Sequence, residues 1–141
     1  MHDIVLFIEA HLGLSCAVIA IVIALMMIEL IKAKQNAAKV SPQQAIQLMN
    51  HQNAAIIDIR NKETFVNGHI LNAMSIPLTE LSQQGNKLDK MKTQPIIIVC
   101  ASGSESQHAA ALLIKQGFNH VTILANGIRA WRDAGLPLIK G

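Results

Sequence analysis

The longest apolar stretch of the chain lies close to the N-terminus. Residues 12–28 carry no charged side chain, and the apolar pattern continues past a single Glu29 to Ile31. A membrane-spanning helix needs roughly 20 mostly apolar residues, and a domain of roughly 100 residues has little interior in which to bury such a helix. The residues before the stretch include acidic ones but no lysine or arginine, unlike the positive start of a cleaved signal peptide. The pattern predicts an N-terminal tail at 1–11 and one transmembrane helix at 12–31.

From residue 40 onward, short apolar runs alternate with amphipathic segments. Ser41-Pro42 followed by Gln44, for example, predicts a capped helix start. Such alternation is typical of a parallel sheet covered by helices. We expect an α/β domain at 40–141, joined to the apolar helix by a polar linker at 32–39. Its expected strands are 55–59, 73–76, 96–100 and 121–124, and its expected helices are 42–50, 79–84 (closed by Gly85), 107–116 and 127–134.

Charge is distributed unevenly on the two sides of the apolar stretch. Lys32, Lys34 and Lys39 follow it, whereas no lysine or arginine precedes it. Positively charged flanks stay on the cytoplasmic side of membranes. We therefore expect a single-pass protein of a bacterial inner membrane whose domain faces the cytoplasm, a compartment that keeps thiols reduced.

The expected domain carries little net charge. Residues 40–141 contain nine lysines and arginines and six acidic residues, without a run of like charge, and the whole chain has one tryptophan and no tyrosine. This composition gives no reason to expect a nucleic-acid partner. The six histidines show no metal-ligand spacing, and the sequence contains no glycine-rich nucleotide loop. We expect neither a bound metal nor a cofactor.

The strongest chemical signal surrounds Cys100. Four β-branched residues, Ile96 to Val99, run directly into this cysteine, and small residues then lead into the next predicted helix. Ligands of α/β sheets bind beyond the carboxyl ends of the strands, where the free N–H groups of a following helix favour anions. These surroundings suit a nucleophilic thiolate. A cysteine that ends a buried strand can also serve only as a small hydrophobic residue, and the local sequence leaves both interpretations open.

Four short motifs accompany this cysteine in a fixed order. They are Asp58-x-Arg60, Glu63 followed by Gly68-His69-Ile70, Cys100-x-x-Gly103 and Gly127-Ile128-x-x-Trp131. In this order and spacing, residues 40–141 resemble the rhodanese (sulfurtransferase) family. The resemblance implies a doubly wound parallel sheet flanked by helices, preceded here by the transmembrane helix. It also implies that Cys100 takes sulfane sulfur from a small donor or a protein persulfide, holds it as a persulfide and passes it to a thiophilic acceptor.

The resemblance assigns roles to two further groups of residues. The loop after the cysteine is expected to bind the outer sulfur through its backbone amides; it consists of Ala101, Ser102, Gly103, Ser104, Glu105 and Ser106. A charged, hydrogen-bonded cluster is expected near the carboxyl end of the sheet, supporting the loop rather than reacting; it consists of Asp58, Arg60, Glu63 and His69.

Two positions depart from the family pattern. Asn126 stands where a glycine usually precedes Gly127, but asparagine also tolerates left-handed backbone. Glu105 stands where active members often carry arginine. Like charges about 4 Å apart repel by about 4 kcal/mol at an effective dielectric of 20, whereas a helix N-terminus returns only about 0.3–1 kcal/mol. An inward Glu105 would therefore weaken anion binding, an outward one would have little effect, and the sequence does not decide between them.

The residues around Cys100 also bear on three other functions. A cysteine phosphatase needs an arginine six residues after its cysteine to stabilise phosphoryl charge, and Ser106 occupies that position. Glu105 and the membrane tether fit a second possibility, a weakly catalytic or non-catalytic domain that docks a membrane or cytosolic partner. A third possibility is a relay that takes persulfide sulfur from another protein; in that case Glu105→Arg raises activity with thiosulfate more than with a persulfide donor.

Overall fold

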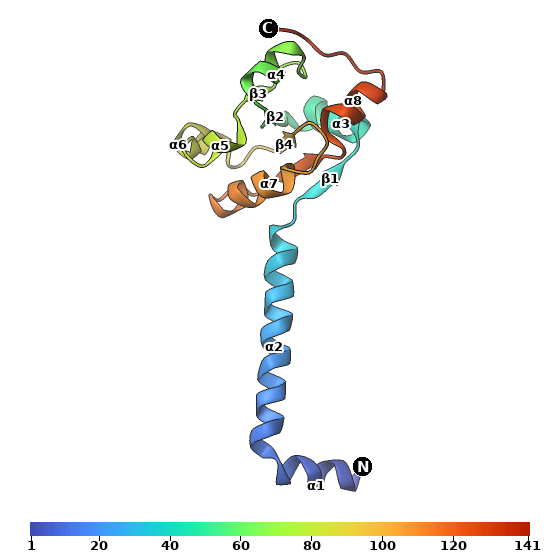
Figure 1. The fold of residues 1–141 in the computed structure, drawn as a ribbon, viewed down its shortest axis with the longest axis vertical. Helices are drawn as coiled ribbons and strands as arrows, with labels where there is room; N and C mark the ends of the chain where they lie inside the picture. The colour runs from blue at the N-terminus through green and yellow to red at the C-terminus, as the bar shows by residue number, and fades with distance from the viewer. The chain divides into compact units, whose positions relative to one another are not determined.

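The computed structural model describes the backbone of residues 1–141 and all side chains except those of Lys34 and Gln35. The chain forms two compact units, Met1–Lys34 and Gln35–Gly141. Figure 1 follows the chain from two N-terminal helices into the α/β unit.

The N-terminal unit consists of helices α1 (His2–Ala10) and α2 (Leu12–Gln35). The segment Leu12–Ala33 reaches a mean hydropathy of 2.8, and none of its most apolar part is buried. Its length and composition are sufficient to cross a membrane, although a signal sequence near an N-terminus meets the same two criteria. Large apolar side chains are exposed along the helix, and an apolar surface of this extent is typical of a site that contacts a membrane or another protein.

A five-stranded parallel sheet forms the frame of the second unit. Its strand order is β1-β5-β4-β2-β3, and every neighbouring pair is parallel. The strands are β1 (Ala38–Val40), β2 (Ala55–Asp58), β3 (Met74–Ser75), β4 (Ile96–Val99) and β5 (Val121–Leu124). The predicted parallel α/β sheet is thus confirmed; β5 has the expected bounds, and β2, β3 and β4 are slightly shorter than expected.

The edge strand β1 was not predicted, and its first two residues, Ala38 and Lys39, lie in the segment expected to be a linker. A three-residue strand is too short to show the alternation that marks a strand in a sequence. Its position depends on pairing with β5, with Lys39 opposite Ile123. Ala37, just before the strand, is buried in the core. The sheet therefore begins before residue 40.

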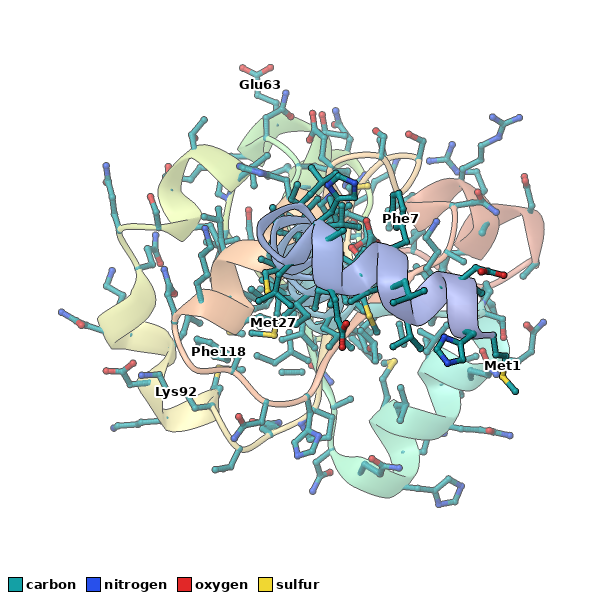
Figure 2. The ribbon with its side chains drawn as sticks, turned by 90° about the horizontal axis from the view of Figure 1, so that it is seen from below. Met1, Phe7, Met27, Glu63, Lys92 and Phe118 are labelled. Atoms are coloured by element: carbon teal, nitrogen blue, oxygen red, sulfur yellow. The ribbon has the colours of Figure 1, made fainter. Side chains whose placement is uncertain are left out.

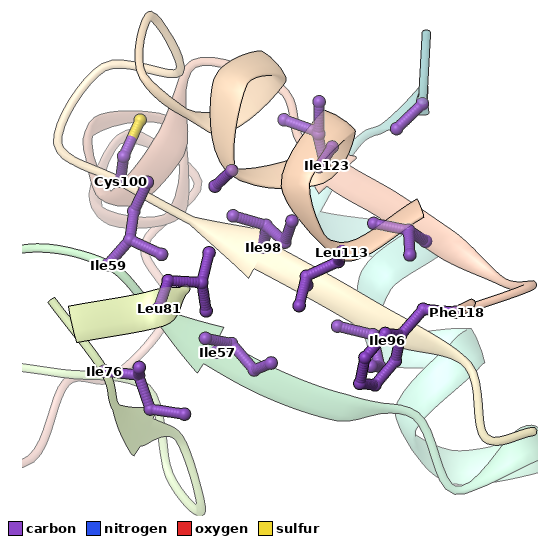
Figure 3. Packing of buried hydrophobic residues seen from close by; sticks show 14 of the residues in the cluster. Ile57, Ile59, Ile76, Leu81, Ile96, Ile98, Cys100, Leu113, Phe118 and Ile123 are labelled. Atoms are coloured by element: carbon purple, nitrogen blue, oxygen red, sulfur yellow. The ribbon is translucent and has the colours of Figure 1, made fainter. Parts of the chain in front are cut away.

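Helices cover both faces of the sheet. They are α3 (Pro42–Gln52), α4 (Lys62–Asn67), α5 (Leu78–Leu81), α6 (Gly85–Leu88), α7 (Ser106–Lys115) and α8 (Gly127–Asp133), with a 3-10 turn at Asp89–Met91. On one face, Leu81 and Leu113 pack over Ile98 (Figure 3). On the other face, Trp131 packs in a second cluster with Ile97. Successive residues of β4 therefore enter opposite cores, which explains why the whole strand is apolar.

The helix boundaries confirm one local prediction and correct another. The capping box at the start of α3 is present, because Ser41 Oγ accepts from the Gln44 amide at 3.2 Å and Gln44 Oε1 accepts from the Ser41 amide at 2.9 Å. The prediction that Gly85 closes a helix is wrong, since Gly85 begins α6. A Cβ at this position would lie 3.2 Å from Gln116 Oε1. Gly85 therefore lies beside the flexible side chain of Gln116 and does not close a helix.

Candidate active site

Cys100 follows the last residue of β4, at the carboxyl edge of the sheet. The residue is 2% exposed and belongs to the border of one core cluster. Its sulfur points toward the loop that follows (Figure 3), and the residue also lines a surface pocket. One side of Cys100 therefore packs against the core while the other is available to a ligand.

The loop after Cys100 folds back so that a backbone amide faces the sulfur. The N–H of Gly103 donates a hydrogen bond to Cys100 Sγ at 2.7 Å. Gly103 has a φ of 92°, in the positive region that glycine adopts more readily than other residues do. A Cβ at this position would lie 3.1 Å from the Asn126 nitrogen. Glycine thus satisfies both the turn and the close contact that bring this amide to the sulfur.

The carbonyl side of the same loop is held by the first turn of α8. The amide of Ile128 donates to the Cys100 carbonyl oxygen at 2.9 Å, and the amide of Arg129 donates to the Ala101 carbonyl oxygen at 3.3 Å. Gly127 lies against this contact, and a Cβ there would be 2.1 Å from the Cys100 oxygen. Asn126 adopts the left-handed conformation with a φ of 57°, as expected for its side chain.

A pocket of about 230 Å³ opens beside Cys100. Its lining residues come from the end of β2, from α4 and from the loop; they are Arg60, Asn61, Thr64, Cys100, Ala101, Ser102, Ser104 and Glu105. Four of the six expected loop residues therefore line the pocket. Gly103 reaches Cys100 through its amide and lines a different recess. Ser106 is fully buried at the start of α7.

Glu105 occupies a position between the two orientations considered from the sequence. It is the residue before α7, is exposed to solvent and also lines the Cys100 pocket. Glu105 is therefore both accessible to solvent and part of the pocket wall, and it contributes a formal negative charge to this part of the surface.

Asp58 and Arg60 form a buried ion pair at the end of β2. Nη2 of Arg60 lies 2.6 Å from Asp58 Oδ2, and Nε of Arg60 donates to Oδ1 at 2.9 Å. The same Nη2 also donates to the Gly68 carbonyl oxygen at 2.8 Å. The pair thus ties the end of the strand to the turn after α4, while Arg60 still contributes to the pocket wall.

The other two expected supporting residues differ in their surroundings. His69 is buried, its Nδ1 donates to the Phe65 carbonyl oxygen at 2.9 Å, and its ring stacks on Phe65 at 3.9 Å between centroids. Glu63 extends outward into solvent (Figure 2). Among the side chains that the structure describes, no hydrogen bond or ion pair joins Glu63 to the other three. The structure brings Asp58, Arg60 and His69 around one turn and leaves Glu63 apart.

Two pocket residues, Asn61 and Thr64, are absent from the sequence-based site. Asn61 caps α4, with Oδ1 accepting from the Thr64 amide at 2.9 Å. The signal available in the sequence is an asparagine, a favoured N-cap residue, directly after the Asp58-x-Arg60 motif. This cap starts α4 beside the pocket and so presents Asn61 and Thr64 to it.

The protein has two cysteines, and both are free thiols. Cys16 is exposed on α2, and Cys100 lies at the pocket. In the part of the chain whose side chains are described, no three His, Cys, Asp or Glu residues gather as metal ligands would. The nucleophile that the pocket offers is the Cys100 thiol, with the Gly103 amide beside it.

These features define a class of protein: an α/β domain with a cysteine at the carboxyl edge of a parallel sheet, followed by a loop that brings a backbone amide to its sulfur. A comparison with known families agrees with this class. The model of the rhodanese-like domain matches residues 41–134. The chain belongs to the rhodanese-like domain family, and the family resemblance seen in the sequence is confirmed.

Individual relatives extend the comparison. Uncharacterized protein YibN of Escherichia coli strain K12 is 30% identical over 142 residues, covering 100% of this chain and 99% of that protein. Thiosulfate sulfurtransferase GlpE of Pseudomonas putida strain GB-1 is 34% identical over 96 residues, covering 67% of this chain and 84% of that protein. The crystal structure of thiosulfate sulfurtransferase from Pseudomonas aeruginosa is 26% identical, with a TM-score of 0.68 over 80% of this chain and 22% of that one.

Proposed function

We propose that this chain is a membrane-anchored sulfurtransferase that carries sulfane sulfur as a persulfide on Cys100 to a thiophilic acceptor. The main observation behind the proposal is the position of Cys100 Sγ, beside a pocket and within hydrogen-bond distance of the Gly103 amide. The family membership and the sulfurtransferase relatives support the same chemistry. A small sulfur donor or a protein persulfide supplies the sulfur.

The proposed reaction has two displacement steps. In the first, the Cys100 thiolate attacks the sulfane sulfur of the donor, the donor's S–S bond breaks, and the leaving group departs with the electron pair. Thiosulfate releases sulfite in this step, and an organic persulfide releases a thiolate. In the second step, the acceptor attacks the outer sulfur of the Cys100 persulfide and regenerates the thiolate. Each step exchanges one bond to sulfur for another, so no external oxidant or reductant is needed.

The surroundings of Cys100 favour negative charge on the sulfur. The Gly103 amide is already directed at Sγ, and α7, a helix of 10 residues, begins at the end of the loop. Backbone N–H groups and the positive end of a helix stabilise an anion placed beside them. These groups stay in place during both steps and so stabilise the thiolate and the persulfide anion alike.

The proposed anchor is α2, with the rhodanese-like domain in the cytoplasm of a bacterium. The exposed apolar surface of the helix supports the anchor, and the lysines that follow it support the orientation. Protease added to inverted membrane vesicles should degrade the domain, whereas protease added to intact spheroplasts should spare it. The opposite pattern of protection would contradict the proposed orientation.

The sulfur-carrier function is tested by intact-mass analysis of the full chain in non-ionic detergent. After incubation with thiosulfate or with a persulfide donor, the protein should gain the mass of one sulfur atom. Cys100→Ser should abolish the gain, whereas Cys16→Ser, a matched change at the second cysteine, should leave it intact. A folded protein that gains no sulfur from either donor, or that gains it equally as Cys100→Ser, would refute the function.

A docking function is a second candidate, favoured by the exposed Glu105 at the pocket. Pull-down from membranes separates it from sulfur transfer. A partner that remains bound to Cys100→Ser would support docking, and the absence of any retained partner would count against it.

A further inference from the structure

We propose that Glu105 makes the Cys100 pocket select organic persulfides, whose sulfane sulfur is bonded to an uncharged or cationic group, over dianionic donors such as thiosulfate. This inference rests on the sulfurtransferase function proposed above and specifies its donor class. It is based on the two charged residues that line the pocket, Arg60 and Glu105.

Two of the residues in the pocket wall are charged. Of the eight residues that line the pocket, Arg60 and Glu105 carry a formal charge, and the thiolate of Cys100 adds another when it forms. The Arg60 guanidinium is held by Asp58 through contacts of 2.6 and 2.9 Å and by the Gly68 carbonyl oxygen. Asp58 is 1% exposed, so its charge stays with Arg60 and cancels it.

Glu105 carries the other formal charge of the pocket wall. Among the described side chains, no ion pair neutralises Glu105, whereas the glutamate at position 80 pairs with Lys62 at 3.2 Å. Glu105 is exposed and is one of the residues that line the pocket. With Arg60 cancelled by Asp58, the fixed charge of the pocket is that of Glu105, and it is negative.

Two further cations lie near the loop but outside this pocket. Lys39 lines a recess with Ser104 and Asn126, and Arg129 lines another with Asp133. Neither recess includes Cys100, and both cations are exposed. Glu105, by contrast, belongs to the lining of the Cys100 pocket itself, so it is the charge that a donor in this pocket meets.

The two donor classes differ in the charge that they bring to the pocket. Thiosulfate brings two negative charges close to the sulfur that is attacked, and each is repelled by Glu105. An uncharged persulfide, R–S–SH, brings none, whereas the Gly103 amide lies beside Cys100 Sγ whichever donor reacts. Thiosulfate plus the Cys100 thiolate gives the persulfide anion and sulfite, and the organic persulfide R–S–SH gives the same protein persulfide anion and the thiol R–SH, which carries away the donor's proton. The protein product is the same, so the donor's charge is what Glu105 distinguishes.

The experiment measures the second-order rate constant of sulfur loading by intact mass, using full-length protein in non-ionic detergent. The donors are thiosulfate and the persulfide of N-acetylcysteine amide, which carries no charge when protonated. Glu105→Gln should raise the rate constant with thiosulfate about tenfold and change the rate constant with the neutral persulfide less than about twofold. Glu63→Gln removes the same charge from an exposed glutamate outside the pocket and should change neither.

Ionic strength provides an independent readout. Because like charges repel, added salt should accelerate thiosulfate loading of the wild-type protein and have a smaller effect on Glu105→Gln. A Glu105→Gln variant that changes both donors equally, or neither, would overturn the inference while leaving sulfur loading at Cys100 established. Failure of both donors to load wild type and variant would instead refute the sulfurtransferase function itself.

Discussion

Asp58 and Arg60 lie two positions apart at the end of β2, and each neutralises the other inside the domain. Both were identified from their motif, because a strand that ends in Asp-x-Arg brings the two side chains to the same edge of the sheet. Glu63 belongs to a neighbouring motif but is exposed, and Glu105 is both hydrated and at the pocket. Motif spacing places a residue along the chain, but side-chain direction depends on packing that spacing does not encode.

The buried pair leads to a prediction at this scale. Asp58→Asn leaves the Arg60 charge buried without its counterion, and we expect a loss of about 3 kcal/mol in the free energy of unfolding. Glu80→Gln breaks the exposed pair with Lys62 and should cost less than about 1 kcal/mol. Urea denaturation of the two variants measures the difference. Equal shifts in their unfolding midpoints would show that burial does not set the strength of this pair.

At the scale of elements, four apolar runs predicted four of the five strands. A fully buried strand such as β4 must be apolar on both faces, and the sequence shows this directly. The fifth strand, β1, and the helices α5 and α6 have only three or four residues each. β1 pairs with β5, and Gly85 at the start of α6 lies beside Gln116. Their positions follow from tertiary contacts rather than from the local pattern of residues.

The contact between the loop and α8 carries a second prediction. Gly127→Ala places a Cβ against the Cys100 carbonyl oxygen at a positive φ, and we expect a destabilisation of about 2–4 kcal/mol together with loss of sulfur loading. Gly135→Ala is the control, because Gly135 also has a positive φ of 71° but nothing lies within 4 Å of its added Cβ. That variant should cost about 1 kcal/mol and should load sulfur normally. Denaturation and intact-mass analysis measure the two effects.

At the scale of the whole molecule, the apolar helix and the α/β unit are separate bodies of different character. The α/β unit contains both buried clusters and includes Ala37 in its core. The expectation of a separate domain came from the sequence pattern, because an uncharged apolar stretch is followed by alternating strands and helices. It could not place the start of the sheet, which depends on the pairing of β1 with β5.

Truncation tests this organisation. Residues 35–141 should be soluble without detergent and should unfold cooperatively, since the core lies within them. Residues 41–141 lack β1 and Ala37, so β5 becomes an exposed edge that can pair with other chains. We expect this shorter fragment to have a lower Tm and to aggregate. Size-exclusion chromatography and thermal unfolding compare the fragments, and identical behaviour would show that β1 is dispensable.

The bonds from α8 to the loop also set the direction of the loop's own donors. In a trans peptide the N–H points opposite to the C=O. With the carbonyls of Cys100 and Ala101 held by α8, the amides of Ala101 and Ser102 must point away from that helix. The polarity of the loop backbone is therefore fixed by a contact that involves no loop side chain. A substitution of a loop side chain such as Glu105 therefore leaves this contact in place, and the charge of the pocket can change without turning the amides of Ala101 and Ser102.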